Sequence, residues 1–213
     1  MPNLTASQMP RTVRRGDASD ELVLAAQAHG MVSIDTETTG LDPRLARLCT
    51  IQIHVPDWGT EVIQVESDTA PEHVRLLVES ADVTKVFHHA VFDLGFLRAQ
   101  FGISSSQVRC TKIAAKLLWP GQKRRQSLAG LTEDLLGEPM PKAEQLSDWT
   151  RPDLTDAQVT YAARDAEVLP PLLGKLQEEL GDRDLLQLAS ACWLHIPTRV
   201  ELEAQDFGDV FSY

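Results

Sequence analysis

Two acidic residues lie close together in the segment from Met31 to Leu41, and this segment constrains the fold more than any other. Successive side chains of an extended strand point to opposite faces, so Asp35 and Glu37 share one face. Neighbouring carboxylates on a partly buried strand repel each other, and a divalent metal ion would make the arrangement favourable. The alternative is a half-buried edge strand with a solvated acidic face. The Thr-Thr-Gly turn at 38–40 favours a site, because α/β sheets place their sites in loops after strands.

Helix and strand signals alternate along the chain, which predicts an α/β sheet flanked by helices. The turn sequence at 56–59 favours an antiparallel pair on either side of it. We expect residues 1–17 to be a flexible amino-terminal arm, 18–195 to be one domain and 196–213 to be a tail. Strands are expected at 31–37, 48–55, 61–65 and 83–88, and helices at 18–30, 71–80, 91–101, 111–119, 128–136, from 155 to the proline pair at 170–171, and on to about 195.

Composition restricts the partners of the chain. It has 213 residues and a formal net charge of −11, whereas proteins that grip long nucleic acids usually have a basic surface. Nucleic acid is therefore either not the substrate, or is short and held by metal ions and a local basic patch. No segment reaches the ~18 apolar residues that cross a bilayer, and the start lacks the apolar core of a signal peptide. The three cysteines, Cys49, Cys110 and Cys192, read as reduced thiols, so we expect a cytoplasmic protein.

Basic residues are concentrated between positions 112 and 125. They are candidates for the patch that holds a substrate phosphate, although a solvated helix face and loop would show the same composition. The members are Lys112, Lys116, Lys123, Arg124 and Arg125, with Lys142 further along the chain.

Three more residues have spacings that suit an acidic site. Asp93 lies at the start of a predicted helix, directly after a strand that ends in two histidines. Tyr161 and Asp165 are four apart on one predicted helix and share a face. Taken singly, each feature has an ordinary explanation: a first-turn aspartate that favours the helix dipole, and a surface contact between neighbours.

In combination these motifs resemble the three exonuclease motifs of the DEDD superfamily, in its tyrosine-bearing subgroup. The matching segments are Asp-Thr-Glu at 35–37, Asp93 after the strand end, and Tyr-Ala-Ala-Arg-Asp at 161–165. The resemblance implies a ribonuclease H-like mixed α/β sheet flanked by helices. Ser-Asp-Trp at 147–149 looks like the ribonuclease D branch. Within that branch, the Cys-Thr-Lys-Ile-Ala segment at 110–114 and the chain from 192 to 197 look like the nano-RNase C family of compact dinucleotidases.

The resemblance also implies a mechanism and the residues that perform it. Two divalent ions, Mg2+ or Mn2+, would be held by Asp35, Glu37, Asp93 and Asp165. Tyr161 would position the attacking water or assist its deprotonation. Substrate contacts are expected from Thr36, Thr38, Gly40, Leu41, His88, Lys112, Lys116, Arg124 and Arg125, with Leu41 as a wedge between two bases. For Leu41 the competing interpretation is a core leucine, and for His88 a local hydrogen bond. Val91 departs from the family, which has an arginine there.

The expected activity is 3′-to-5′ hydrolysis of short RNA, chiefly 5′-phosphorylated dinucleotides, to nucleoside monophosphates. One alternative is ribonuclease D-like trimming of longer RNA or DNA ends, and another is a catalytically silent module that keeps the fold. Nano-RNase C proteins form octameric rings, so the resemblance implies a homo-oligomer without an accessory RNA-binding domain. The apolar tail residues Phe207, Val210, Phe211 and Tyr213 are expected at a subunit contact, or packed on their own domain.

Overall fold

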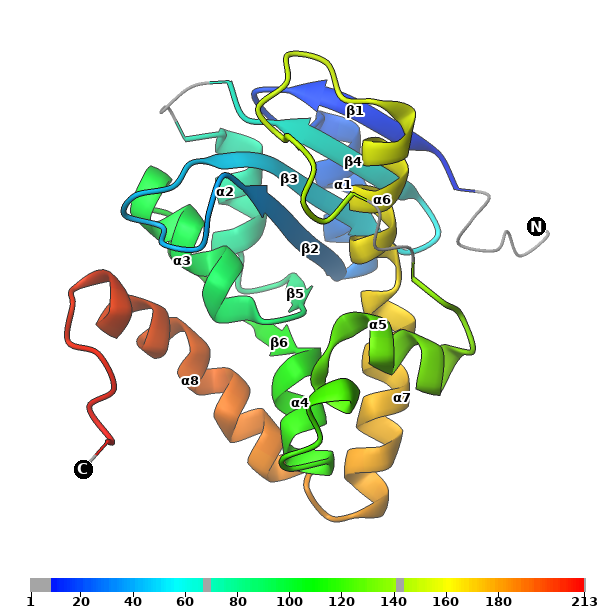
Figure 1. The fold of residues 1–213 in the computed structure, drawn as a ribbon, viewed down its shortest axis with the longest axis vertical. Helices are drawn as coiled ribbons and strands as arrows, with labels where there is room; N and C mark the ends of the chain where they lie inside the picture. Colours follow the sequence, from blue (N-terminus) through cyan, green and yellow to red (C-terminus); the bar gives the residue numbers. More distant parts are fainter. Residues whose placement is uncertain (1–8, 67–69, 141–143, 213) are drawn as a thin grey trace.

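A mixed six-stranded sheet organises the described part of the chain, with the strand order β1-β4-β3-β2-β5-β6 (Figure 1). Strands β3 and β4 are antiparallel, as the turn between them predicts, and β2 is antiparallel to β3 but parallel to β5. The computed structural model describes residues 9–66, 70–140 and 144–212, so the expectations for Lys142 and Tyr213 lie outside the described residues. The strands are β1 (Arg11–Arg15), β2 (Met31–Thr38), β3 (Leu48–Val55), β4 (Gly59–Gln64), β5 (Thr84–Phe87) and β6 (Val108–Cys110).

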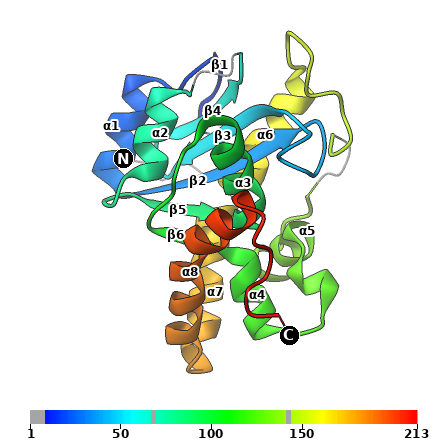
Figure 2. The ribbon, with the colours of Figure 1, turned by 90° about the vertical axis from the view of Figure 1, so that its left-hand side faces the viewer.

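Helices cover both faces of the sheet. Helices α1 (Asp20–His29) and α2 (Glu72–Glu79) lie on one face, and α6 (Asp156–Glu167) crosses strands β2, β3 and β4 on the other (Figure 2). Beyond β6, α4 packs against both α7 and α8, and α8 also packs against α3. The bounds of the remaining helices are α3 (Ala90–Phe101), α4 (Thr111–Leu118), α5 (Leu128–Leu131), α7 (Leu169–Asp182) and α8 (Leu186–Ala204), with the short helical segments η2 (Lys123–Gln126) and η3 (Thr132–Leu136).

For Arg11–Arg15, strand β1 corrects the expectation of a flexible arm over residues 1–17. Arg11–Arg15 pair in parallel with β4 and extend the sheet by one strand. The segment looks solvated because arginines dominate it, but Arg11 and Arg14 form ion pairs with carboxylates of the folded domain. Partners this distant in sequence cannot be read from a local pattern.

Helix α8 corrects the expected boundary of the tail. The helix continues through Pro197 to Ala204, instead of ending near residue 195. Ile196 and Val200 are buried on either side of the proline, and this packing offsets the hydrogen bond that a proline removes. Among the described residues, no helix combines the length and apolarity that crossing a membrane requires.

Candidate active site

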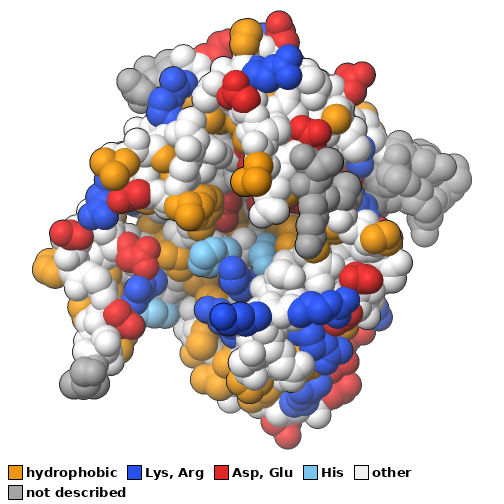
Figure 3. All heavy atoms as spheres, viewed as in Figure 1, with side chains coloured by type: hydrophobic (Ala, Val, Ile, Leu, Met, Phe, Trp, Pro, Cys, Tyr) orange, Lys and Arg blue, Asp and Glu red, His pale blue; other side chains and the backbone are white. Residues whose placement is uncertain are grey.

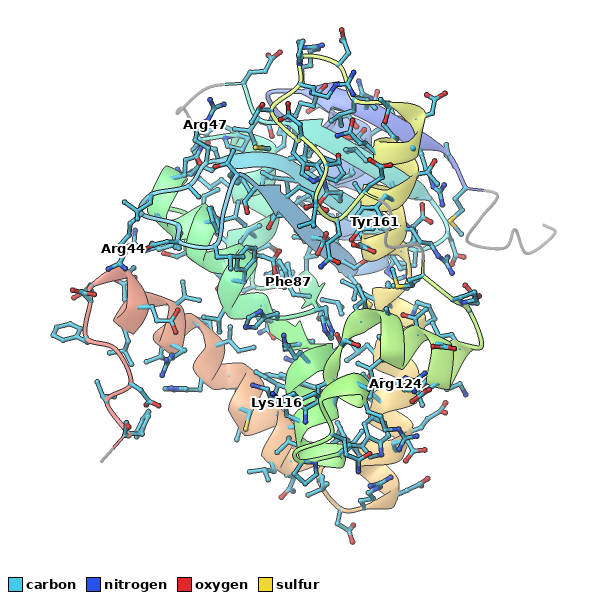
Figure 4. All side chains as sticks on the ribbon, viewed as in Figure 1. Arg44, Arg47, Phe87, Lys116, Arg124 and Tyr161 are labelled. Atoms are coloured by element: carbon cyan, nitrogen blue, oxygen red, sulfur yellow. The ribbon has the colours of Figure 1, made fainter. Side chains whose placement is uncertain are left out.

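Three carboxylates converge where strand β2 meets helix α6. Asp35 and Glu37 share a face of β2, as alternation predicts, and Asp165 reaches them from α6. One oxygen atom from each of the three carboxylates lies within 4.8 Å of the others. A bulge follows Glu37 in the β2–β3 pairing and ends the regular strand at this point. The two segments are far apart in the sequence and form one acidic site. Figure 4 shows Tyr161 of α6 beside strand β2.

Helix α6 is fixed at both ends, which sets the position of Asp165. At its start, Thr155 and Gln158 form the expected capping box, and Gln158 Nε2 donates to Ser147 Oγ at 2.6 Å. Near its end, the Ser33 hydroxyl of β2 donates to the Ala166 carbonyl at 2.7 Å. The buried residue Ala162 has a small side chain, which lets the helix lie close to the sheet.

Asp93 approaches the same site from the first turn of α3. Its side chain is buried, and its Oδ1 accepts a hydrogen bond of 2.7 Å from the Thr36 hydroxyl. Asp93 is not one of the three carboxylates that lie within mutual ligand distance. Its charge nevertheless acts on Asp35 and Glu37 and raises their pKa values.

Two threonines expected to contact substrate have partners within the chain. Thr36 holds Asp93, and the Thr38 hydroxyl donates to the Gly40 carbonyl at 2.6 Å, which closes the turn after β2. There is little space for a side chain at Gly40, because a Cβ there would lie 3.2 Å from the Ala46 side chain. These residues therefore shape the site and the loop that carries Leu41.

Asp93 and Asp165 are buried and Asp35 and Glu37 are half-buried, and no cation forms an ion pair with these four carboxylates among the described residues. Burial first, and then repulsion from neighbouring carboxylates, raises the pKa of Asp35 well above its ordinary value and that of Glu37 to about 8. Burial also raises the pKa of Asp93 and of Asp165 to about 7. An all-oxygen donor set that resists ionisation without a cation fits Mg2+ or Mn2+.

Tyr161 shares a face of α6 with Asp165 and is half-buried. Burial raises the pKa of the Tyr161 phenol, as do the negative charges of Asp165 and Glu37, and the phenol in turn lowers the pKa of the neighbouring Asp165 carboxyl. The Trp149 ring lies 6.2 Å from the Tyr161 ring, centroid to centroid, and supports it. The phenol therefore stays protonated and serves as a hydrogen-bond donor directed at the acidic site.

Leu41 lies in the loop beyond β2 and is 85% exposed, so it is not a core leucine. It borders a groove of about 720 Å³ between this loop, α3 and the end of α8. His89 and Phe92 line the groove, and their rings stack with centroids 6.2 Å apart. Val91, which departs from the family pattern, also lines it.

The two histidines at the end of β5 have different surroundings. His88 is within 2.8 Å of the Thr111 hydroxyl through Nδ1, and burial lowers its pKa to about 3. His89 instead faces the groove from a left-handed backbone conformation, with φ of 76°, which is unusual for a residue other than glycine. The sequence signalled a histidine at this strand end, but its pattern could not tell which of the two faces the groove.

The basic segment divides into two parts. Lys112 of α4 is close enough to Asp93 to oppose the rise in pKa that burial causes in that carboxyl. Burial lowers the pKa of His89, and the charges of Lys112 and Lys116 lower it further. Arg124 and Arg125, in contrast, pair with Asp134 at 2.7 and 3.2 Å, and Arg124 also pairs with Glu133. Lys123 is exposed on η2. Figure 3 shows basic side chains gathered beside the histidines near the middle of one face.

Comparison with known proteins identifies the family. The profile of a 3′–5′ exonuclease family matches residues 10–181. DNA polymerase I of Aquifex aeolicus is 36% identical over 151 residues, which are 71% of this chain and 24% of that protein. Ribonuclease D of Gluconacetobacter diazotrophicus is 32% identical over 154 residues, 70% of this chain and 37% of that enzyme. The chain therefore spans well under half the length of these curated relatives.

Similarity to solved structures of NrnC extends over nearly all of both chains. Brucella melitensis NrnC with bound Mg2+ has a TM-score of 0.88 and 34% identity, covering 96% of this chain and 100% of that one. NrnC of the same species bound to pGG gives the same TM-score and identity and covers 97% of this chain. The six-stranded mixed sheet with flanking helices is thus the ribonuclease H-like fold that the motifs imply. The chain belongs to the 3′–5′ exonuclease family, in the branch that contains ribonuclease D and NrnC.

Proposed function

We propose that this protein is a metal-dependent 3′-to-5′ exoribonuclease that hydrolyses short RNA, chiefly 5′-phosphorylated dinucleotides. The observation that carries the proposal is the convergence of Asp35, Glu37 and Asp165, with Asp93 close by and Tyr161 on the same face of α6 as Asp165. Carboxylates gathered in this way form a site for hard cations. The likeness to NrnC bound to pGG supports the choice of substrate.

The proposed chemistry follows from the roles of the side chains. Two divalent ions held by the four acids would supply a nucleophilic water at neutral pH and stabilise the leaving oxygen. Asp35 and Glu37 would contribute metal ligands from strand β2, and Asp165 would contribute one from α6. The Tyr161 hydroxyl orients the water by hydrogen bonding. Thr36 keeps the Asp93 carboxylate directed toward the other acids.

The groove beside Leu41 suits a short substrate. Leu41 is exposed where it can wedge between two bases, and His89 and Phe92 offer flat surfaces for stacking. Lys112 and Lys116 supply positive charge on the His89 side of the site, where they would bind a terminal phosphate. A short ligand held in this way is compatible with a net charge of −11.

Substrate length tests the proposal against the second candidate. Ribonuclease D-like trimming of longer RNA or DNA is favoured by the similarity to ribonuclease D and DNA polymerase I. We expect rapid hydrolysis of a 5′-phosphorylated RNA dinucleotide with Mn2+ and much slower hydrolysis of a seven-residue RNA under equal conditions. Equal rates on both would favour the trimming enzyme. No turnover of either would favour the silent module.

We also propose that the protein forms a homo-oligomer, with an octamer as the expected state. The end of the chain exposes Phe207, Val210 and Phe211, and a contiguous apolar surface of this kind usually marks an interface. Light scattering at micromolar concentration tests this, because a monomer would contradict it. The free thiols of Cys49, Cys110 and Cys192 suit a reducing cytoplasm, where we place the activity.

A further inference from the structure

A second buried charge cluster lies behind helix α6. The Glu167 side chain is 0% exposed, and Arg11 of β1 donates two hydrogen bonds to its carboxylate, of 2.7 Å from Nε and 2.6 Å from Nη2. The Thr60 hydroxyl of β4 donates to the same carboxylate at 3.1 Å. His54 Nδ1 lies 3.0 Å from the Thr60 oxygen and serves as the donor there, because the Thr60 hydrogen is already used.

Arg11 is itself held in place by the sheet. It is the first residue of β1 and lies opposite Thr60 in the parallel β1–β4 pairing. The Thr60 amide donates to the Pro10 carbonyl at 2.9 Å, which fixes the start of the strand. Arg11 thus ties the edge strand of the sheet to the end of α6.

The position of Glu167 on α6 links this contact to the acidic site. Residues two apart on a helix differ by ~200° around its axis, so Glu167 and Asp165 point in nearly opposite directions. A bidentate ion pair on the far side resists rotation of the helix more strongly than a single hydrogen bond would. Tyr161 and Asp165 lie on the same helix, so a rotation of α6 would displace both.

We propose that Arg11 and Glu167 act as positioning residues, forming a rear strap that holds α6 in the orientation required by Asp165 and Tyr161. This inference rests on the metal site proposed above. A buried ion pair often adds little net stability, because desolvation offsets the attraction, whereas it fixes geometry. Loss of the strap should therefore weaken metal binding and lower kcat by more than its effect on the stability of the fold would explain.

Two substitutions on β1 provide a matched test. Arg11→Met keeps the alkyl chain and removes the strap. Arg14→Met is the control, because Arg14 pairs at 3.1 Å with Glu61, which binds Ser19 at the start of α1. Glu61 follows Thr60 on β4, so its side chain points to the face of the sheet opposite Glu167. The measurements are Mn2+ binding by calorimetry, kcat and KM on a 5′-phosphorylated dinucleotide, and thermal unfolding with EDTA.

We expect Arg11→Met to weaken Mn2+ binding by about tenfold and to lower kcat by about 10-fold to 100-fold. Arg14→Met should leave both at the wild-type value, and Arg11→Lys should recover part of the loss. If Arg11→Met does not yield folded protein, Glu167→Gln, which keeps the side-chain shape, should show the same two losses.

Two results would overturn the strap in distinguishable ways. Wild-type Mn2+ affinity and kcat in a strap variant that merely unfolds at a lower temperature would make the ion pair structural only. Failure of the wild-type protein itself to bind Mn2+ would overturn the metal site, and the strap with it.

Discussion

Helix α6 separates two clusters of charged side chains that are balanced in different ways. Behind the helix, the Glu167 carboxylate accepts hydrogen bonds from Arg11, whose charge balances it, and from Thr60. In front of it, Asp35, Glu37 and Asp165 lie together, and in the described part of the chain no lysine or arginine forms an ion pair with them. Buried charge is costly unless it is paired. The rear cluster is therefore complete within the chain, whereas the front cluster requires a cation from outside.

The largest expected effect comes from removing one charge at the front. Asp165→Asn nearly preserves the shape of the side chain but removes a metal-binding charge, so kcat should fall by about 1000-fold or more. Steady-state hydrolysis of a dinucleotide with Mn2+ measures this. The control is Asp156→Asn, an exposed carboxylate in the first turn of the same helix. Activity above a few per cent of wild type in the Asp165 variant would show that the front cluster is not the metal site.

A smaller effect is expected from the hydrogen bond next to that charge. Tyr161→Phe removes only the hydroxyl, so kcat should fall by about 100-fold. KM and Mn2+ binding should stay close to wild type, because the carboxylates are untouched. A variant that changed KM alone would show that Tyr161 binds substrate and does not position the water.

The basic residues show the same contrast between unbalanced and balanced charge. Lys112 acts on Asp93 without a carboxylate at ion-pair distance among the described residues, whereas Arg124 already pairs with Asp134 and Glu133. Lys112→Met should raise KM for a 5′-phosphorylated dinucleotide by about tenfold. Arg124→Met should raise it less. A larger rise for Arg124→Met would show that its ion pairs open to receive the phosphate.

Local periodicity was sufficient to predict the two local parts of the front cluster, whereas their meeting in one site was implied by the family resemblance. Alternation along β2 places Asp35 and Glu37 on one face, and helical spacing places Tyr161 beside Asp165, both as observed. The capping box at Thr155 also follows from a short pattern. These features depend on neighbours within four residues, so the sequence contains the information needed to predict them.

The rear cluster depends on partners that are distant in sequence. Arg11 meets Glu167 across 156 positions, so no pattern within residues 1–17 reveals that contact, and the segment looks like a solvated arm. The sequence predicts a substrate contact for Thr36. It does not predict the hydrogen bond from Thr36 to Asp93, because that bond requires α3 to pack beside β2. The left-handed backbone that turns His89 to the groove is likewise set by the junction of β5 and α3.

The smallest expected effect is on stability, and it distinguishes the two clusters without any assay of turnover. The ordinary pKa of an aspartate or glutamate in the unfolded chain is about 4. Burial raises the pKa of Asp93 and Asp165 to about 7 and that of Glu37 to about 8 in the folded protein. Between about pH 4 and pH 8 the folded state therefore binds more protons than the unfolded state, so stability falls as the pH rises across this window.

Thermal unfolding in EDTA should show this dependence, with Tm lower at about pH 8.5 than at about pH 5.5 by about 5 °C. Mg2+ should raise Tm more at the higher pH, because it replaces the protons that the carboxylates have lost. Asp165→Asn should flatten the slope, since it removes one titrating group from the front cluster, whereas Arg14→Met should keep it. A Tm that rose with pH in EDTA would mean that the front carboxylates are balanced within the chain, as Glu167 is, and the difference between the two sides of α6 would disappear.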